Sequence, residues 1–416
     1  MDQKFRTSVE RIRRDIDTLA KYSSVQSEGC TRFTYTKEFA EARDYIRSEM
    51  EKAGLAVRED AVGTVIGRME GSDPDAPVIM TGSHFDTVKT GGKFDGMAGV
   101  TAALETARVL SEEGFKPRCS IEFVALPEEE GARFGSGLFA SRAMCGQLTK
   151  EEIDNAVDED GITLRQAMKA YGLDPDRVQE ARRTPGSIRA FIELHIEQGP
   201  ILEKEGTDVG IVDSIVGLRC RNYHVHGRSD HAGNTPMNMR ADSLLAAMRA
   251  VTEAADKAVE IGENTVCTCG NLSVRPGAFN IVANETFFQL DCRSRLLSNV
   301  DRVFKVLHHS LDKSVRENPG LSYDWEDKLS ARQVEMDEAI RGIMAEEARD
   351  AGLSTRHMLS GAGHDAMVMG SIADAAMVFV PSRGGRSHVP EEWTDYEDLQ
   401  KGVELVYRTI RRLAAE

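Results

Sequence analysis

Hydrophobic residues along the chain follow two alternating patterns. Short apolar runs such as TVIGRME, PVIMTGSH, CSIEFVALP and AAMVFVP are typical of buried strands. Between them, apolar residues recur with helical spacing, which predicts helices over about 6–22, 37–53, 97–113 and 333–352 and at the C-terminus. Strands that alternate with helices indicate an α/β fold with a central mixed sheet flanked by helices.

The pattern changes between about residues 214 and 326. Here LRCRNYHVHG, TVCTCGNLSV and ETFFQLDCR predict strands, and helices are expected over about 239–261 and 298–316. This order of elements predicts an inserted α+β domain. We therefore expect residues 1–213 and 327–416 to form one catalytic domain and residues 214–326 to form the insert.

Composition limits the partners and the location of the protein. The chain has 416 residues, 41% of them hydrophobic and 29% charged, as in ordinary soluble proteins. Its net charge of −16, without a local basic cluster, disfavours nucleic acid and anionic membranes as partners. No apolar run reaches the roughly 18 residues of a membrane span. The start, MDQKFRTSVERIRRDIDTLAKY, lacks the apolar segment of a signal peptide, which predicts a cytoplasmic protein.

The seven cysteines are scattered and include no CxxC pair. This argues against a disulfide framework and against a structural zinc knuckle. We expect them to be core or surface thiols.

Polar side chains follow three of the predicted strands, where an α/β sheet carries its ligands. His84, Asp86 and Asp95 lie in GSHFDTVKTGGKFDG, the glutamates 128–130 follow SIEFVALP, and His195 follows IRAFIEL. Two divalent ions about 3.5–4 Å apart can activate a water molecule, and they need a bridging carboxylate with His or carboxylate ligands on either side.

Asp95 suits the bridging position, with His84 beside it. The glycines of TGGKFDG allow the backbone to turn tightly there. Asp86 is then expected to orient His84 by accepting its other N–H. Taken alone, a His-x-Asp triplet is more often an ordinary polar loop.

Five further motifs occur in order: PEEEGARFGSGLFASRAM, IELHIEQGP, GRSDHAGNTPM, GAGHDAM and VPSRGGRSHVPEE. With GSHFDTVKTGGKFDGMAGV they resemble the hydantoinase/carbamoylase branch of the M20 family of binuclear metallohydrolases. That branch includes N-carbamoyl-L-amino acid hydrolases, β-ureidopropionases and allantoate amidohydrolases. The resemblance runs from about residue 30 to the C-terminal helix. One departure is Thr64 in VGTVIG, where the family commonly has Gly-Asn, and it bears on the subfamily rather than on the chemistry.

The resemblance implies two divalent metal ions, one held by His84, Asp95 and His195 and the other by Asp95, Glu130 and His388. Zn²⁺, Mn²⁺, Co²⁺ and Ni²⁺ all suit such ligands. Counting back from GARF makes Glu130 the ligand, Glu129 the general base and Glu128 an additional glutamate. The register stays open by one residue, because the family usually has only two glutamates here.

The resemblance also implies which residues meet the substrate. His231 matches a histidine that donates to the oxyanion, and Asn280 and Arg293 match positions that hold the substrate carboxylate. Gln198 is a polar pocket residue, and His364 at the start of a helix is expected to contact substrate or support the ligands. Outside the motifs, such residues are often only turn, solvated or helix-start positions.

The expected function is metal-dependent hydrolysis of the ureido C–N bond of N-carbamoyl-L-amino acids to amino acid, CO2 and ammonia. Allantoate amidohydrolase, β-ureidopropionase, and M20 peptidase or aminoacylase activities remain alternatives, as does an inactive binding scaffold. In the resembling enzymes the inserted domain acts as a lid and forms a homodimer. A symmetric dimer through residues 214–326 is therefore expected, with a small ureido-carboxylate as substrate.

Overall fold

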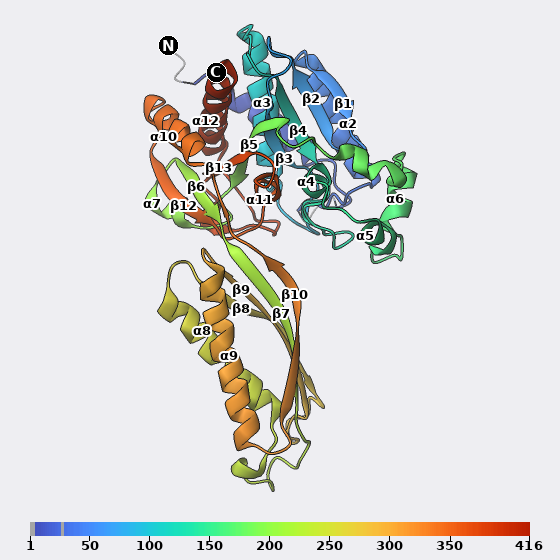
Figure 1. The fold of residues 1–416 in the computed structure, drawn as a ribbon, viewed down its shortest axis with the longest axis vertical. Helices are drawn as coiled ribbons and strands as arrows, with labels where there is room; N and C mark the ends of the chain where they lie inside the picture. The colour runs from blue at the N-terminus through green and yellow to red at the C-terminus, as the bar shows by residue number, and fades with distance from the viewer. Residues whose placement is uncertain (1–4, 26–28) are drawn as a thin grey trace. The chain divides into compact units, whose positions relative to one another are not determined.

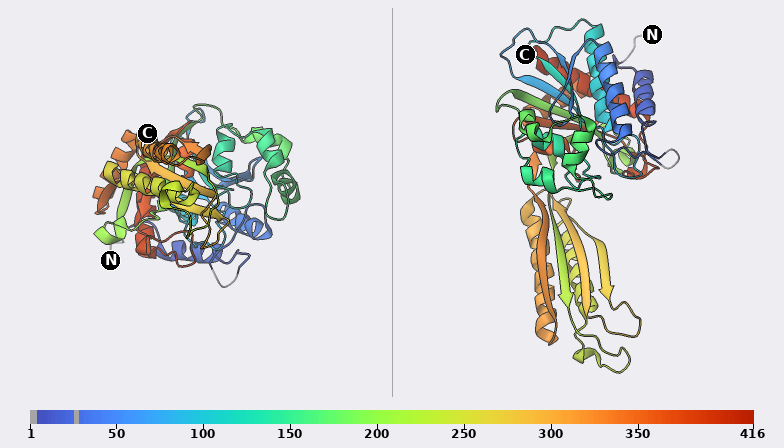
Figure 2. Two further views of the ribbon diagram at one scale, coloured as in Figure 1. Left: turned by 90° about the horizontal axis from the view of Figure 1, so that it is seen from below. Right: turned by 90° about the vertical axis from the view of Figure 1, so that its right-hand side faces the viewer.

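The computed structural model describes residues 5–25 and 29–416, which fold as two compact units (Figures 1 and 2). The first unit contains Met1–Asp213, Met336–Met358 and His364–Glu416, and the second contains Ser214–Glu335 and Leu359–Gly363. The predicted insert boundary at 326 falls inside strand β10 (Ser322–Ala331), and the second unit continues beyond it.

The first unit is built on a mixed sheet. Its strands lie in the order β1 (Ala56–Glu59), β2 (Val65–Met69), β4 (Ile121–Leu126), β3 (Val78–His84), β5 (Ile188–Ile196), β13 (Asp374–Val380) and β6 (Val209–Ile215), and β12 (Thr355–Ser360) also pairs with β6. The central strands β4, β3, β5 and β13 run parallel, and the outer pairs are antiparallel. The predicted α/β class with a mixed sheet is confirmed.

Helices cover the sheet of this unit. The long ones are α1 (Val9–Leu19), α2 (Lys37–Lys52), α3 (Met97–Glu112), α10 (Glu338–Asp350) and α12 (Tyr396–Ala415). Short ones are α4 (Phe139–Met144), α5 (Lys150–Asn155), α6 (Leu164–Tyr171), α7 (Ile201–Glu205), α11 (Asp365–Met369) and the 3-10 turns Pro175–Ala181 and Arg383–Gly385. Helices α3 and α12 pack against each other and against β3 and β5. Strands β3 and β4 are therefore buried along their whole length.

The parallel strands bring distant polar segments to one edge of the sheet. His84 ends β3, the glutamates 128–130 follow β4, and His195 lies at the end of β5. The segment with His388 follows β13. Because the carboxyl ends of parallel strands share an edge, these side chains can form one site.

The second unit is an antiparallel sheet covered on one face by two long helices (Figures 1 and 2). The strand order is β10, β7 (Gly217–His226), β9 (Glu285–Ser294) and β8 (Val266–Arg275). The helices are α8 (Ser243–Ile261) and α9 (Leu297–Glu317), with a 3-10 turn at Met237–Met239, and β11 (Val334–Glu335) pairs with residues 214–215. Buried and half-buried residues alternate along β9, so one face packs on the helices.

Strand β8 forms one edge of this sheet and is exposed along most of its length. In neither unit do the residues described include a helix that is both long and apolar enough to cross a membrane.

Candidate metal centre

The carboxylate of Asp95 lies between two sets of polar side chains. Its Oδ1 is 3.3 Å from His84 Nε2 and 3.2 Å from His195 Nε2. Its Oδ2 is 3.4 Å from His388 Nε2 and accepts a hydrogen bond of 2.7 Å from Gln198 Nε2. Each carboxylate oxygen thus faces a different set, which is the arrangement that a bridging ligand needs.

Two of the three consecutive glutamates face these imidazoles. Glu130 Oε1 lies 3.3 Å from His388 Nε2, and Glu129 Oε2 lies 3.8 Å from His84 Nε2. The carboxyl group of Glu128 is buried elsewhere and accepts a hydrogen bond from the backbone N–H of Phe134.

These side chains fit divalent cations. Three groups have all their ligand atoms within 4.8 Å of one another: His84, Asp95 and His195; His84, Glu129 and Glu130; and Asp95, Glu130 and His388. His84 and His195 are each only 1% exposed. Several carboxylates gathered in a buried place repel one another, and cations relieve that cost. Imidazole and carboxylate are the ligands of zinc and related metals.

The contacts of Asp86 differ from the predicted ones. His84 Nδ1 lies 3.1 Å from the main-chain carbonyl oxygen of Asp86, while the Asp86 carboxylate is 3.7 Å away. That carboxylate instead accepts the backbone N–H groups of Glu129 (3.1 Å) and Glu130 (3.2 Å). The reason is that Asp86 points toward the glutamate turn, which offers two unpaired donors. Asp86 therefore orients His84 through its backbone and the glutamates through its side chain.

The two buried histidines present the same ring nitrogen to Asp95. Nδ1 of His195 lies 3.0 Å from the carbonyl oxygen of Ile196, as Nδ1 of His84 does from that of Asp86. A carbonyl requires the ring proton at Nδ1, so in the neutral form each imidazole presents its Nε2 lone pair on the side of Asp95, where that of His195 also faces the N–H of Gly96 at 3.4 Å.

The loop between β3 and α3 is held in place by close contacts. Gly96 has φ of 67°, and a Cβ there would lie 2.5 Å from the His84 ring. A Cβ on Gly92 would lie 2.1 Å from Glu392 Oε1. Glu392 accepts the backbone N–H groups of Phe94 (2.9 Å) and Asp95 (3.0 Å). Glycines at 92 and 96 let the loop approach Glu392 and His84 closely.

Burial and charge shift the acid–base properties of the centre. Burial raises the pKa of Glu129 well above its usual value, against the opposing effect of His84 and with reinforcement from Glu130. Burial opposes ionisation of Asp95 too, but His195 and the other imidazoles lower its pKa well below the usual value. Asp95 is thus ionised, and the Glu129 carboxyl holds a proton more firmly than an ordinary glutamate does.

Comparison with known proteins identifies the family. Residues 80–412 match the model of Peptidase family M20/M25/M40. The chain is 46% identical to the N-carbamoyl-L-amino-acid amidohydrolase of Paenarthrobacter aurescens, over 98% of both chains. This chain belongs to Peptidase family M20/M25/M40.

Other relatives place this M20 chain more closely. It is 37% identical to the allantoate amidohydrolase of Bacillus subtilis (strain 168), over 96% of both chains. The crystal structure of an amidase of the hydantoinase/carbamoylase family from Burkholderia multivorans matches this chain with a TM-score of 0.90. The two sequences are 31% identical, and the match covers 99% of this chain and 98% of that chain. The resemblance to this branch is confirmed.

Gln198 and His364, two predicted substrate residues of the M20 chain, lie beside the ligands. Gln198 has φ of 55° and donates to Asp95, as described above. The ring centroid of His364 is 4.4 Å from that of His195, and burial lowers its pKa well below the usual value. His364 is therefore a neutral imidazole packed against a ligand.

His231 and Asn280 are neighbours in the second unit. His231 forms a β-bridge with Ile281, and the N–H of Ala232 donates to the carbonyl oxygen of Asn280 at 3.0 Å. His231 Nδ1 accepts hydrogen bonds from the backbone N–H groups of Gly233 (3.1 Å) and Asn234 (3.2 Å). Because Nδ1 accepts, the ring proton is on Nε2, where the exposed side chain can serve as a donor.

Arg293 lies at the other end of the same sheet. Its guanidinium forms a two-point ion pair with Asp291, at 2.8 and 2.9 Å, and donates to the carbonyl oxygen of Gly361. Strand β9 pairs Glu285 with His226 at the end near His231, and Arg293 is at the opposite end. The strand from Glu285 to Arg293 spans roughly 26 Å at about 3.3 Å per residue. One small substrate cannot touch both Arg293 and His231 of the same second unit.

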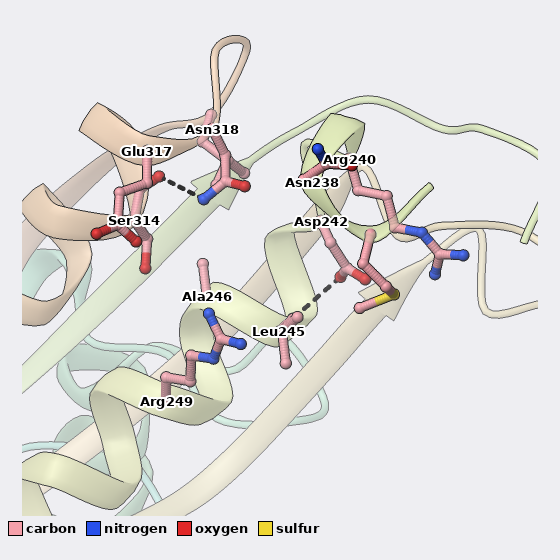
Figure 3. Close-up of a pocket in the computed structure, with 11 residues that line it drawn as sticks. Asn238, Arg240, Asp242, Leu245, Ala246, Arg249, Ser314, Glu317 and Asn318 are labelled. Atoms are coloured by element: carbon pink, nitrogen blue, oxygen red, sulfur yellow. Dashed lines mark hydrogen bonds between the residues drawn. The ribbon is translucent and has the colours of Figure 1, made fainter. Parts of the chain in front are cut away.

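A separate cavity of about 330 Å³ lies in the second unit (Figure 3). The end of α9 and the first turns of α8 line it, and Asp242 caps α8 by accepting the N–H of Leu245 at 3.0 Å (Figure 3). Arg240, also in its lining, donates to the carbonyl oxygens of Ala232 and Thr235. This cavity contains none of the predicted site residues, but Arg240 supports the turn that carries His231.

Proposed function

We propose that this M20 chain hydrolyses the ureido C–N bond of N-carbamoyl-L-amino acids to the free amino acid, CO2 and ammonia. The observation that carries the proposal is the Asp95 carboxylate facing two sets of ligand atoms, with Glu129 beside one of them. The 46% identical relative, named for this reaction, supports the choice of substrate.

The proposal includes two divalent cations, one held by His84, Asp95 and His195 and the other by Asp95, Glu130 and His388. When bound, such cations supply Lewis acidity that polarises the attacked carbonyl group and lowers the pKa of water. The ligands suit Zn²⁺, Mn²⁺, Co²⁺ or Ni²⁺, and the donor set alone does not choose among them.

Glu129 moves the proton in this scheme. Its carboxylate takes a proton from the attacking water molecule, and burial, which raises the pKa of Glu129, makes it hold that proton until it is returned. Water adds to the carbamoyl carbon, the bond to the amino nitrogen breaks, and Glu129 delivers the proton to that nitrogen. The carbamate released then decomposes to CO2 and ammonia.

Five further residues complete the proposed site. Arg293 and Asn280 bind the substrate carboxylate, and His231 donates from Nε2 to the oxyanion. Gln198 and His364 contact the substrate beside the ligands.

The distance along β9 supports a homodimer in which the two ends of the sheet serve different sites. Since Arg293 and His231 of one second unit cannot meet the same substrate, we infer that His231 and Asn280 of the partner subunit complete the site that Arg293 serves. The exposed edge strand β8, with Val266 and Leu272 at its surface, suits pairing with a second copy.

Allantoate is the second candidate substrate. It also carries a carboxylate and ureido groups, and the chain is 37% identical to the Bacillus subtilis allantoate amidohydrolase. β-Ureidopropionase activity and cleavage of an ordinary amide, as in a peptidase or aminoacylase, are further alternatives within the same chemistry. A cytoplasmic location stays a prediction.

Ammonia release from a substrate panel tests the proposal. The enzyme is treated with a chelator and reloaded with each of the four metals in turn. It is then assayed for ammonia with N-carbamoyl-L-amino acids, N-carbamoyl-β-alanine and allantoate, and for newly formed amino groups with dipeptides, whose hydrolysis releases no ammonia. We expect metal-dependent ammonia release that is fastest with N-carbamoyl-L-amino acids. Release from allantoate alone, or cleavage of dipeptides alone, would refute this choice of substrate.

A further inference from the structure

Two thiols face each other across the edge of the sheet in the second unit. Cys267 on β8 is paired directly with Cys292 on β9 in the antiparallel register. Their Sγ atoms lie 3.3 Å apart, and both are free thiols. Directly opposed residues point to the same face of a sheet, and here that face packs on the two helices. The two sulfur atoms therefore need to approach by a little over 1 Å to reach the S–S bond length of about 2.05 Å.

The environments of the two thiols differ. Cys292 is completely buried, whereas Cys267 on the edge strand is half-buried. The hydrogen bond between them lowers the pKa of Cys267, and the same bond, with burial, raises the pKa of Cys292. Because the thiolate is the reactive form, Cys267 is the thiol that meets an oxidant first.

We propose that Cys267 and Cys292 form a reversible dithiol site that hydrogen peroxide converts into a cross-strand disulfide. The Cys267 thiolate attacks one peroxide oxygen, the O–O bond breaks, and hydroxide leaves and takes up a proton, which gives a sulfenic acid. The sulfur of Cys292 then attacks the Cys267 sulfur, the S–O bond breaks, and water leaves with the Cys292 proton. In total, two thiols and one peroxide give one disulfide and two water molecules.

The disulfide would fix the edge strand. Within a single subunit, strand β8 has a hydrogen-bonded neighbour on one side only, so its amides there open more easily than those of β9. A covalent bond to β9 at the Cys267 end removes that freedom. Arg293, the next residue along β9, points to the opposite face. Formation of the disulfide does not depend on the proposed function, whereas amide exchange in β8 does, because pairing with a second copy would protect the same amides.

Peptide mapping of the whole protein tests this site. The native protein is treated with a stoichiometric amount of hydrogen peroxide, the remaining thiols are blocked, and the peptides are analysed by mass spectrometry. We expect a peptide linked through Cys267 and Cys292 that a dithiol reductant separates. Amide exchange in β8 should slow by about tenfold on oxidation and recover on reduction.

Two variants sharpen the test. Cys269→Ser removes an exposed thiol on the same strand and should leave the linkage intact. Cys267→Ser should leave Cys292 reduced, because that buried thiol then has no reactive partner, and circular dichroism checks that the variant is folded. Oxidation of Cys267 to a sulfinic acid beside a free Cys292, or linkage of Cys267 to another cysteine, would overturn the proposal.

Discussion

Three consecutive glutamates follow β4, and each lies in a different environment. Glu128 has φ of 56° and turns its carboxyl group into the protein, toward Phe134. Glu129 is near His84, and Glu130 is near His388 and belongs to the group that includes Asp95. The left-handed conformation at Glu128 reverses the chain, so that the next two side chains reach the site. This geometry favours the register in which Glu128 is the additional residue.

Replacing each glutamate by glutamine should therefore give three different enzymes. Glu129→Gln removes proton transfer, so turnover should fall by several orders of magnitude while bound metal is retained. Glu130→Gln should also weaken metal binding, because a ligand is lost. Glu128→Gln should be mild. The measurements are kcat and metal content for each variant. If the Glu128→Gln enzyme kept its metal but were inactive, Glu128 would be the general base, and the assignment made here would be wrong by one residue.

Glu128 should also leave a signature in the pH dependence of stability. Burial, reinforced by Asp86, raises the pKa of Glu128 to about 8 from an ordinary value of 4.5. A raised carboxyl pKa stabilises the folded state fully below the unfolded pKa, and this contribution is lost as the pH rises through about 8. Glu128→Gln stays neutral and should lose nothing over that range.

Urea unfolding of both proteins at about pH 5, 7 and 9 measures this effect. The free energy of unfolding of the wild type, relative to the variant, should fall by on the order of a few kcal/mol between the extremes. A difference that stays constant with pH would contradict the assignment.

Arg293 and His231 should separate kinetically. Arg293→Ala should mainly raise KM for N-carbamoyl amino acids and have little effect on the corresponding amide, which lacks the carboxylate. His231→Ala should mainly lower kcat, by about 10²–10³, because its hydrogen bond strengthens as negative charge develops. Steady-state kinetics with the acid and the amide check both. If Arg293→Ala impaired turnover of the acid and of the amide equally, Arg293 would not bind the substrate carboxylate.

Some residues of the site could not be found from the sequence. The expected ligands stand at strand ends within motifs, where both position and chemistry point to them. Glu392 and Ser387 lie inside the motif VPSRGGRSHVPEE, but both contact residues that are distant in sequence. Ser387 Oγ is 2.7 Å from Asp95 Oδ2, and Glu392 accepts the backbone N–H of Asp95 at 3.0 Å. Asp86 was expected to use its carboxylate on His84, because spacing does not reveal which way a loop side chain turns.

At the level of elements, residue pattern was a good guide to the buried elements and also to the exposed edge strand β8. The predicted strands and long helices are present within a few residues of their expected ends, as in α3 and β13. Strand β10 (SYDWEDKLSA) was missed, because almost every position is exposed and no alternation marks it. It forms by pairing with β7, an interaction that the local sequence does not contain. Helix α8 starts at Ser243 rather than near 239, because Asp242 caps it.

Glu392 connects two loops of the first unit, the one between β3 and α3 and the one after β13. Its Oε1 holds the N–H groups of Phe94 and Asp95, and its Oε2 contacts Ser387. Glutamine can make the same contacts, with its oxygen toward the amides and its NH2 group toward Ser387. Alanine can make none of them, and the Asp95 loop would lose its support.

Glu392→Gln should therefore stay within about threefold of wild-type kcat/KM, whereas Glu392→Ala should lose about 10²-fold, the cost of a small displacement of a catalytic group. Metal affinity of the Ala variant should also fall. Glu391→Ala is the matched control, since the neighbouring Glu391 is exposed and pairs with Arg386 at 3.1 Å. If Glu392→Ala kept normal metal affinity and activity, Glu392 would not be a positioning residue.

At the level of the whole molecule, the proposed dimer predicts complementation between two inactive variants. In a heterodimer of His231→Ala and Glu129→Gln protomers, the site with an intact Glu129 receives His231 of the partner subunit, which is also intact. The other site has both defects. One of two sites should then work, although each parent homodimer is impaired in both.

Co-expression with two different affinity tags and sequential purification isolates the heterodimer. Its activity should be about half that of the wild-type dimer, because symmetry makes the two wild-type sites equivalent. If His231 instead acted in its own protomer, each site of the heterodimer would carry one defect, and activity would stay at the level of the parent variants. Size-exclusion chromatography with light scattering measures the oligomeric state in the same samples, since a monomer would exclude both the complementation and the role of the partner's His231. The experiment thus distinguishes a site completed within one chain from a site completed by two, a distinction that follows from the length of β9.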